Sequence, residues 1–335
     1  MINMQILDSN EIRKAANILK TGGIVAFPTE TVYGLGANAY DQQAVTKIFK
    51  AKNRPDDNPL ISYVSSYEML YTITNDIPAI AAKLMKDFWP GPLTLKLKSR
   101  EDVPVTITGG SDMVAVRMPD HEIALALINE VGVPIVASSA NISGRPSPTM
   151  TKHVTNDLDG KIDAIIRGDD CKIGIESTIV DLTVTPPAVR RPGAICIEEI
   201  IESVGAIAVE GELVNSPGMR YRHFSPQTPL TLVEGERTRV LVKINHLIQN
   251  YQKQGLKVGV LACHESSEDI YCDEKYILGS INDLKEVARR LYSGLRFLDD
   301  MKVDVGIAEG TFPEEREGKV IMNRLRRAAE ERFSC

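Results

Sequence analysis

The first fifty residues alternate between helical and strand-like spacing of their apolar side chains. Apolar positions fall on one face over residues 10–21, which predicts a first helix. Ile24 to Phe27 is a short apolar run bounded by glycines and a proline, and it predicts a buried central strand. Helical spacing returns over residues 42–52, where Asp41 is placed to cap the helix and Pro55 to end it. The chain therefore opens with a helix, a strand and a second helix.

The stretch TETVYGLG separates the predicted strand from the second helix. Gly34 and Gly36 predict a sharp turn there, because glycine adopts backbone conformations that a side chain would forbid. Open α/β sheets bind ligands at the carboxyl ends of their strands. We therefore expect Lys52 and Arg54, where the second helix ends, to face the same crevice as Thr29 to Thr31.

Short apolar runs and amphipathic stretches continue to about residue 206. Strands are predicted at residues 60–64, 93–97, 103–107, 113–118, 134–138, 162–167, 177–182 and 189–191. Helices are predicted to begin near residues 66 and 78 and to span residues 121–131 and 197–204. This order predicts an α/β domain over residues 1–206.

The last third of the chain again alternates strands with helices. Strands are predicted at residues 230–233, 258–262 and 305–308, and helices at 239–253, 282–299 and 318–333. The last helix carries Arg324, Arg326 and Arg327, which are expected on a solvated face. Strict alternation predicts a smaller, Rossmann-like parallel α/β domain over residues 230–335. The linker between the domains, residues 207–229, contains the basic and aromatic stretch PGMRYRHFSP.

Composition and charge limit the classes of protein that need to be considered. The chain has 335 residues, 43% of them hydrophobic and 25% charged, with a formal net charge of -6. An acidic chain is unsuited to clamping nucleic acid with its whole surface, so any polyanion site should be local. Five scattered cysteines suggest neither a disulfide framework nor a zinc site. With no signal peptide or membrane-spanning run, a cytoplasmic protein is expected.

Standard catalytic signatures do not occur in the sequence. There is no GxxxxGK[ST] loop, no GxGxxG that opens a helix, and no GxSxG elbow with a plausible triad. The five histidines do not pair at metal-ligand spacing, so no protein metal site is predicted. These absences disfavour P-loop, dinucleotide-binding, serine hydrolase and metallohydrolase chemistry.

Cations and small polar side chains gather instead at the ends of predicted strands and helices. They are Lys52, Arg54, Arg117, Ser139, Asn141, Ser177 and Arg191. Arginine offers a planar fork to carboxylates and phosphates, lysine a point charge, and serine or asparagine a directional neutral donor. The alternative is structural: helix-end cations at a dipole, ion-paired arginines and turn-forming serines.

These residues lie within a series of ordered motifs. In chain order the motifs are FPTETVYGLG, KxRPxxNPL, WPGPLT, VAVRMP, SSANxSG, ESTIVD and RRPG. Over residues 10–205 the chain closely resembles the YrdC/YwlC family of threonylcarbamoyl-AMP synthases. The linker PGMRYRHFSP and the ending NRLRRAA resemble the long form, which has an extra C-terminal domain.

The resemblance implies a fold and a reaction. It implies an open, twisted α/β sheet with a concave basic cleft. The implied substrates are L-threonine, bicarbonate and ATP, the last with Mg²⁺, and the products are threonylcarbamoyl-AMP and pyrophosphate. The product would pass to the tRNA threonylcarbamoyl transferase machinery, which modifies the position beside the anticodon, with at most weak direct binding of tRNA by this chain.

The resemblance also assigns residues to the two sides of the site. Positions that match the threonine side are Thr31, Tyr63, Arg117, Ala137 and Ser177. Positions that match the nucleotide side are Arg54, Asn58, Met113, Ser139, Ser147 and Arg191, with Lys52 and Asn141 completing the signature. We expect Lys52 and Arg54 to act in catalysis by neutralising charge, and no dedicated base is evident. The linker residues Tyr221, Arg222 and His223 are expected to close over the nucleotide as a lid.

Two positions depart from the family pattern. Tyr63 stands where the family usually has histidine, and Met113 where it usually has threonine. Tyr63 can still donate a hydrogen bond, whereas Met113 offers no side-chain donor. Two alternative functions stay open: a module that binds double-stranded RNA or tRNA, and a carbamoyl transferase with another acceptor.

Overall fold

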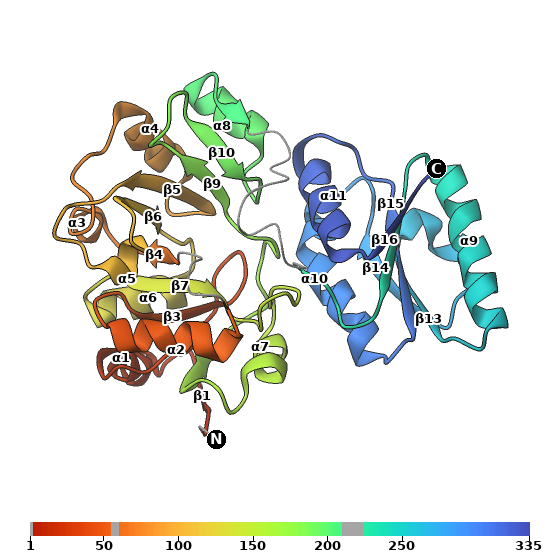
Figure 1. The fold of residues 1–335 in the computed structure, drawn as a ribbon, viewed down its shortest axis with the longest axis horizontal. Coiled ribbons are helices and arrows are strands. Elements are labelled where there is room, and N and C mark those ends of the chain that lie inside the picture. Colours follow the sequence, from red (N-terminus) through yellow and green to blue (C-terminus); the bar gives the residue numbers. More distant parts are fainter. Residues whose placement is uncertain (1–2, 55–59, 210–223) are drawn as a thin grey trace. The chain divides into compact units, whose positions relative to one another are not determined.

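The computed structural model describes residues 3–54, 60–209 and 224–335. The chain divides into two compact units (Figure 1). Unit 1 consists of Met1–Ser143 and Ser147–Gly218, and unit 2 of Gly144–Pro146 and Met219–Cys335. Most of the linker predicted at 207–229 lies outside the described residues, so the predicted domain limits and the lid stay predictions.

Unit 1 is built on an 11-stranded mixed sheet. In spatial order the strands are β1 (Gln5–Leu7), β8 (Ala164–Ile166), β2 (Val25–Phe27), β3 (Gly34–Asn38), β7 (Ile135–Ser139), β4 (Ile61–Tyr63), β6 (Met113–Arg117), β5 (Leu93–Lys98), β9 (Thr178–Asp181), β10 (Ala188–Arg191) and β11 (Ala208–Val209). β3 pairs antiparallel with both β2 and β7, whereas β4 and β6 run parallel. The predicted open α/β sheet is confirmed, and β2 is an interior strand.

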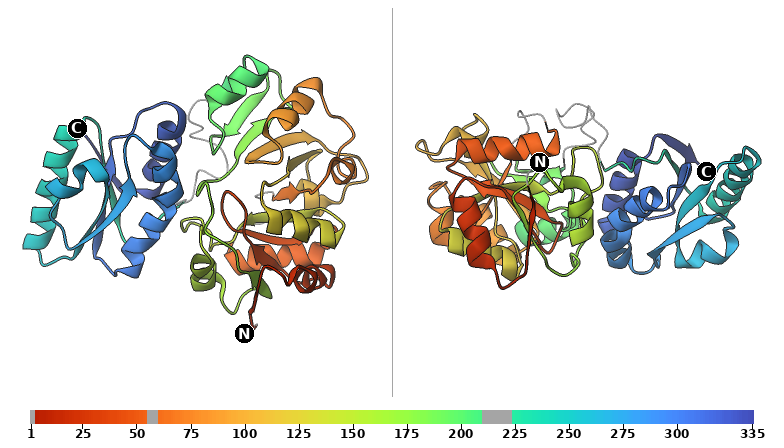
Figure 2. Two further views of the ribbon diagram at one scale, coloured as in Figure 1. Left: turned by 180° about the vertical axis from the view of Figure 1, so that it is seen from behind. Right: turned by 90° about the horizontal axis from the view of Figure 1, so that it is seen from below.

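Helices cover both faces of this sheet. The longer helices are α1 (Ile12–Lys20), α2 (Gln42–Lys52), α4 (Ala79–Phe88), α6 (Glu122–Val131), α7 (Thr151–Leu158) and α8 (Ile197–Val204). Two short helices, α3 (Tyr67–Leu70) and α5 (Val105–Thr108), have four residues each. Side chains alternate along a strand, so Val25 and Phe27 belong to the apolar cluster that includes α1 and α6, while Ala26 belongs to the cluster on the other face, which includes α2, α4, α7 and α8. Viewed from below, α1 and α2 lie on opposite sides of the sheet (Figure 2).

The glycines of GLG do not form the predicted turn. Gly34 and Gly36 lie inside β3, and Gly34 is the register partner of Phe27 in β2. A methyl group on Gly36 would come within 2.6 Å of Ile135 Cγ2 and 2.8 Å of the Phe27 ring. The prediction of a turn was therefore wrong, because these glycines make room for an aromatic ring on a flat strand.

Two other predictions in unit 1 were also incorrect or incomplete. Residues 103–107 are not a strand, since Pro104 and Gly109 enclose the single helical turn α5 and Gly109 takes a left-handed conformation with φ 64°. The helix α7 and the edge strands β1 and β11 were not predicted. Each is short, so its periodicity is weak.

Unit 2 is a five-stranded sheet in which all strand pairs are parallel, as predicted. The strand order is β14 (Glu274–Gly279), β13 (Val258–Cys263), β15 (Val305–Gly310), β12 (Leu230–Glu234) and β16 (Glu331–Ser334). The helix α9 (Arg237–Lys253) covers one face, and α10 (Leu284–Asp300) and α11 (Arg316–Ala328) the other (Figure 1). A 3-10 helix, η2 (His264–Asp269), follows β13.

The end of unit 2 differs from its prediction. The last helix stops at Ala328, and residues 331–334 instead add β16 to the edge of the sheet beside β12. Arg324 is fully buried, with its guanidinium 5.1 Å from the centre of the Phe224 ring, so the arginines of α11 do not all share a solvated face. No helix in the described ranges combines the length and apolar character needed to cross a membrane.

Unit 2 also holds the short segment Gly144–Pro146 through interactions of its own. Ser225 N donates to Gly144 O at 2.8 Å, and Arg145 pairs with Asp299 at 3.0 Å. The Arg296 guanidinium donates to Pro146 O at 2.5 Å. This segment follows SSANIS in sequence, so a loop with several predicted nucleotide contacts has three residues fixed by unit 2.

We expect Gly36→Ala to lower the free energy of unfolding by about 1–3 kcal/mol, because its methyl group has no space beside Ile135 and Phe27. Gly34→Ala is the matched control, since its nearest neighbour would lie at 3.2 Å on the edge of the same ring. Urea unfolding of the two variants measures the difference. Equal losses in both would contradict the steric explanation of β3.

Candidate functional site

Lys52 ties the end of α2 to the loop after β7. Its side chain is 1% exposed, and Nζ donates to the backbone oxygens of Ser139 and Asn141, the latter at 2.7 Å. In return, Ser143 N donates to Lys52 O at 2.8 Å. These bonds join segments 87 residues apart in sequence. The predicted signature residues Lys52, Ser139 and Asn141 are therefore brought together.

The position of Lys52 strongly affects its charge. Burial holds the pKa of Lys52 well below its usual range, and the nearby Arg54 charge lowers it further, while Asp157 has the opposite effect. Arg54 follows Asn53, whose left-handed conformation with φ 50° closes α2. Two cations thus lie one residue apart at a helix C-terminus, where an anion would relieve their repulsion.

A second cluster surrounds Arg117 at the end of β6. Its Nη1 donates to Thr31 Oγ1 at 2.9 Å and to Tyr63 OH at 3.5 Å, and its Nε donates to Gly91 O at 3.2 Å. Its Nη2 lies 2.6 Å from Glu30 Oε1. Three residues predicted for the threonine side, Thr31, Tyr63 and Arg117, are therefore in direct contact.

Packing and charge hold this cluster in place. The Tyr63 ring meets Phe27 edge-on with centroids 6.0 Å apart, and the Arg117 guanidinium lies 5.5 Å from the centre of the Tyr63 ring. Burial alone would lower the pKa of Arg117, but the neighbouring Glu30 carboxylate and Tyr63 more than compensate and raise it. Arg117 therefore keeps its positive charge although its side chain is 2% exposed.

A third cluster joins β5, β9 and β10. Arg191 donates from Nε and Nη2 to Ser177 O at 3.1 and 2.9 Å, and from Nη2 to Ser177 Oγ at 3.1 Å. Ser177 Oγ also lies 2.7 Å from Thr94 Oγ1. Ser147 donates to Glu176 Oε1 at 2.6 Å, next in sequence to Ser177. Residues predicted for the two sides of the site, Ser177 and Arg191, thus touch.

The remaining predicted residues are less informative. Ala137 is buried in the middle of β7 between Gly36 of β3 and Ile61 of β4, so its side chain is a small apolar surface. Met113 begins β6, and its Sδ accepts from Thr183 Oγ1 at 2.8 Å. Asn58, Tyr221, Arg222 and His223 lie outside the described residues.

Two carboxylates of the site were not predicted from the sequence. Glu30 contacts Arg117, and Glu176 accepts from Ser147. Both are buried, with 4% and 7% exposure. The available signal was their position, since each acid directly precedes a residue that was already a candidate, Thr31 or Ser177.

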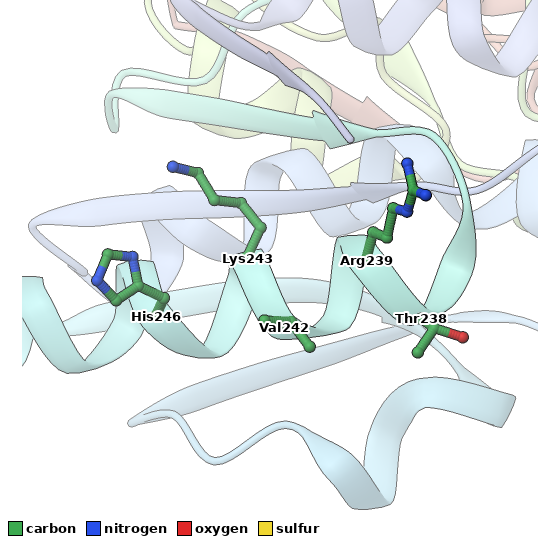
Figure 3. A pocket seen from close by; sticks show the side chains of 5 residues that line it. All are labelled: Thr238, Arg239, Val242, Lys243 and His246. Carbon is green, nitrogen blue, oxygen red and sulfur yellow. The ribbon is translucent and has the colours of Figure 1, made fainter.

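The other groupings in the structure do not extend this site. Where the structure describes the chain, no three histidine, cysteine or acidic residues come together as metal ligands. A shallow hollow of about 310 Å³ lies on the outer face of α9 in unit 2, lined by Thr238, Arg239, Val242, Lys243 and His246 (Figure 3). It contains none of the predicted residues.

Comparisons with known proteins cover both units. A family model described as "Telomere recombination" matches residues 17–193, and one described as "Threonylcarbamoyl-AMP synthase, C-terminal domain" matches residues 195–330. The threonylcarbamoyl-AMP synthase of Pyrococcus abyssi is 50% identical over 326 residues, which cover 95% of this chain and 94% of that protein. The Bacillus subtilis synthase is 47% identical over 326 residues, covering 95% and 93%.

Solved structures give the same result for the fold. The structure of P. abyssi Sua5 complexed with L-threonine superimposes with a TM-score of 0.91 at 46% identity and covers 99% of each chain. A further structure, of a variant of the same Sua5 with two alanine substitutions, has a TM-score of 0.91 at 45% identity, again over 99% of each chain. The fold of this chain is therefore the Sua5 fold.

We expect Lys52→Met to lower the free energy of unfolding by about 2 kcal/mol at neutral pH, because the variant loses the two hydrogen bonds from Nζ to the backbone oxygens of Ser139 and Asn141. The folded state lowers the pKa of Lys52, so between that pKa and about 10.4 the unfolded chain binds more protons. Stability of the wild type relative to the variant should therefore rise as the pH increases through this range.

The matched control is Lys50→Met, which changes an exposed lysine of the same helix and should alter stability by less than about 0.5 kcal/mol. Chemical denaturation of all three proteins at several pH values gives the measurement. A wild-type advantage that shrinks with rising pH would contradict the account of Lys52.

Proposed function

The chain belongs to the Sua5/YciO/YrdC family, in the form that carries the threonylcarbamoyl-AMP synthase C-terminal domain, and we propose that its substrates are L-threonine, bicarbonate and the Mg²⁺ complex of ATP. It is an ATP-using synthase that forms threonylcarbamoyl-AMP, with release of pyrophosphate, for the modification of tRNA. The observation that carries the proposal is the close match along the full chain to a Sua5 structure complexed with L-threonine.

The amino acid is assigned to the cluster around Arg117. A guanidinium is suited to a carboxylate, and hydroxyl groups of Thr31, Tyr63 and Ser177 lie within the same part of unit 1. Ala137 adds a small apolar wall. Tyr63, at the position where histidine is usual, contributes its hydroxyl and its packing against Arg117 and makes no use of an imidazole.

The nucleotide is assigned to the cations around Lys52. An ammonium group has three N–H donors. Lys52 uses two of them for hydrogen bonds to the backbone oxygens of Ser139 and Asn141, and the third remains for a phosphate oxygen. A phosphate beside Lys52 would also favour its charged form. The other assigned residues are Arg54, Asn58, Met113, Ser147 and Arg191, with Tyr221, Arg222 and His223 of the linker as a lid. Met113 can serve only by its backbone or by apolar contact.

The reaction follows from this arrangement of charge. The threonine amine attacks the carbon of bicarbonate, and loss of water leaves a carbamate. A carbamate oxygen then attacks the α-phosphate of ATP in line, which breaks the bond to the β-phosphate and expels pyrophosphate. Lys52 and Arg54, with Arg191, position the phosphates and stabilise charge on their oxygens. Mg²⁺ would arrive bound to the ATP phosphates and would supply further charge neutralisation there; among the described residues, no group of three or more histidine, cysteine or acidic side chains could hold it.

The proposed setting is the cytoplasm. The cysteines of the chain are free thiols, as in a reducing compartment. The product is proposed to pass to the tRNA threonylcarbamoyl transferase machinery, with at most weak direct binding of tRNA. The rival functions, an RNA-binding module or a carbamoyl transferase with another acceptor, would not require L-threonine.

Pyrophosphate release from ATP should require both L-threonine and bicarbonate. Measuring release by the wild type while each component is omitted in turn separates the three functions, since an RNA-binding module releases none and another carbamoyl transferase does not depend on threonine. Undiminished release without L-threonine would contradict the proposed function.

Lys52→Ala should lower turnover at least about 100-fold, because removing one electrostatic donor to a transition state typically slows a reaction by about 100- to 1,000-fold. Lys50→Ala, on the exposed face of the same helix, should keep wild-type turnover. Steady-state pyrophosphate release by folded protein measures both. Equal rates for the two variants would remove Lys52 from the mechanism.

A further inference from the structure

Glu30 is a buried acid that the assignments above leave without a role. It lies in the loop between β2 and β3, between Thr29 and Thr31, and its side chain is 4% exposed. Its Oε1 approaches Arg117 Nη2 to 2.6 Å. The loop itself is well held, since Ile173 N donates to Glu30 O at 2.8 Å and Gly174 N to Thr31 O at 3.0 Å. The carboxylate is therefore fixed beside the arginine assigned to the amino acid.

Glu30 Oε1 and Arg117 Nη2 form a buried ion pair, with the two atoms 2.6 Å apart. Beyond this ion pair, the described residues offer no hydrogen-bond partner to either Glu30 oxygen or to Arg117 Nη2, although all three atoms are buried. Buried polar groups are nearly always hydrogen-bonded, because desolvation without a partner is costly. A buried carboxylate in this condition needs an explanation.

Other buried acids of this chain show what a purely structural carboxylate looks like. Asp181 accepts from Thr183 N at 2.9 Å and from Arg190 Nε at 3.0 Å. Glu309 in unit 2 accepts from Cys263 N and Ser266 Oγ, both at 2.8 Å, and from Thr311 Oγ1 at 2.9 Å. Glu30 departs from this pattern at the place where a substrate is assigned.

The titratable groups around Glu30 differ in charge. The titratable side chains of the described residues that act on it electrostatically include Arg117, His121 and Cys171. Burial lowers the pKa of His121 despite the attraction of Glu30, and burial raises the pKa of Cys171 to about 12. Both are therefore neutral at pH 7, and Arg117 is the charged neighbour.

We propose that Glu30 binds the α-ammonium group of the amino acid substrate, while Arg117 Nη2 takes its carboxylate. Beyond their mutual ion pair, the carboxylate and the guanidinium place one anionic and one cationic group side by side, and this is the complement of an α-amino acid zwitterion. A carboxylate is the side chain that gives the strongest directional bond to an ammonium group. Thr31 Oγ1 is already occupied by Arg117 Nη1 and Thr29 Oγ1, so it is a weaker candidate for the same role.

This inference rests on the proposed function and adds to it the residue that recognises the amine group of the substrate. A ligand that lacks the amine but keeps the carboxylate and the side-chain hydroxyl should still use Arg117 but gain nothing from Glu30. The suitable probe is 2,3-dihydroxybutanoate with the configuration of L-threonine. Glu30 is thus expected to discriminate between two ligands that differ in one group.

The test compares two ligands with two proteins by titration calorimetry. For Glu30→Gln, the affinity for L-threonine should fall about 10- to 100-fold, as expected for loss of a charge-assisted hydrogen bond, while the affinity for 2,3-dihydroxybutanoate should change less than about 2-fold. An equal loss for both ligands would show that Glu30 merely positions Arg117 and would overturn the proposal. Unchanged threonine affinity would overturn it too.

Two further variants secure the interpretation. Glu30→Asp keeps the charge and withdraws it by one methylene group, so it should lose threonine affinity selectively even if Glu30→Gln fails to fold. Glu309→Gln, at a buried acid of unit 2 whose partners Cys263, Ser266 and Thr311 are not assigned to the site, should lower stability without changing the affinity ratio of the two ligands. If the wild type does not bind L-threonine, the proposed function and this inference are both overturned. If the wild type binds L-threonine but Glu30→Gln shows no selective loss of threonine affinity, only this inference is overturned.

Discussion

The buried ammonium group of Lys52 is the interaction on which the arrangement of unit 1 depends. It is the last residue of α2 and donates to backbone oxygens of Ser139 and Asn141 in the loop after β7. Ser139 O also accepts from Asn141 N at 3.0 Å, so the ammonium group adds a donor from a distant segment to a turn that is already hydrogen-bonded. Through this contact, the end of α2 that precedes Arg54 is joined to the loop after β7.

A second buried charge organises the opposite side of the assigned site. Arg117 directs its donors to Thr31, Tyr63 and Gly91 and pairs with Glu30. Buried charges destabilise a fold unless they are paired, and Arg117 has its partner in Glu30. In the proposed assignment, Lys52 belongs to the nucleotide end of the site and Arg117 to the amino acid end.

Much of the fold and of the candidate site could be predicted from the sequence, and the predictions that failed did so for physical reasons. Helix α2 and its Asp41 cap followed from local spacing, and the ordered motifs led to the family. Gly34 and Gly36 were misjudged because a glycine that makes space for Phe27 looks the same in sequence as a glycine that turns the chain. Lys52 was expected to meet an anion, whereas its backbone acceptors lie 87 residues away and no local pattern indicates them. Glu30 was expected among the polar groups at the end of the strand but was given no role, because its partner Arg117 is equally distant in sequence.

The central claim is that this chain joins threonine, bicarbonate and the adenylyl group of ATP into one molecule. The most direct measurement is mass spectrometry of the product formed by the wild type from L-threonine, ATP and ¹³C-labelled bicarbonate. The account predicts threonylcarbamoyl-AMP that carries the heavy carbon in its carbamoyl group. A nucleotide product without the label, or a labelled product that lacks threonine, would contradict it.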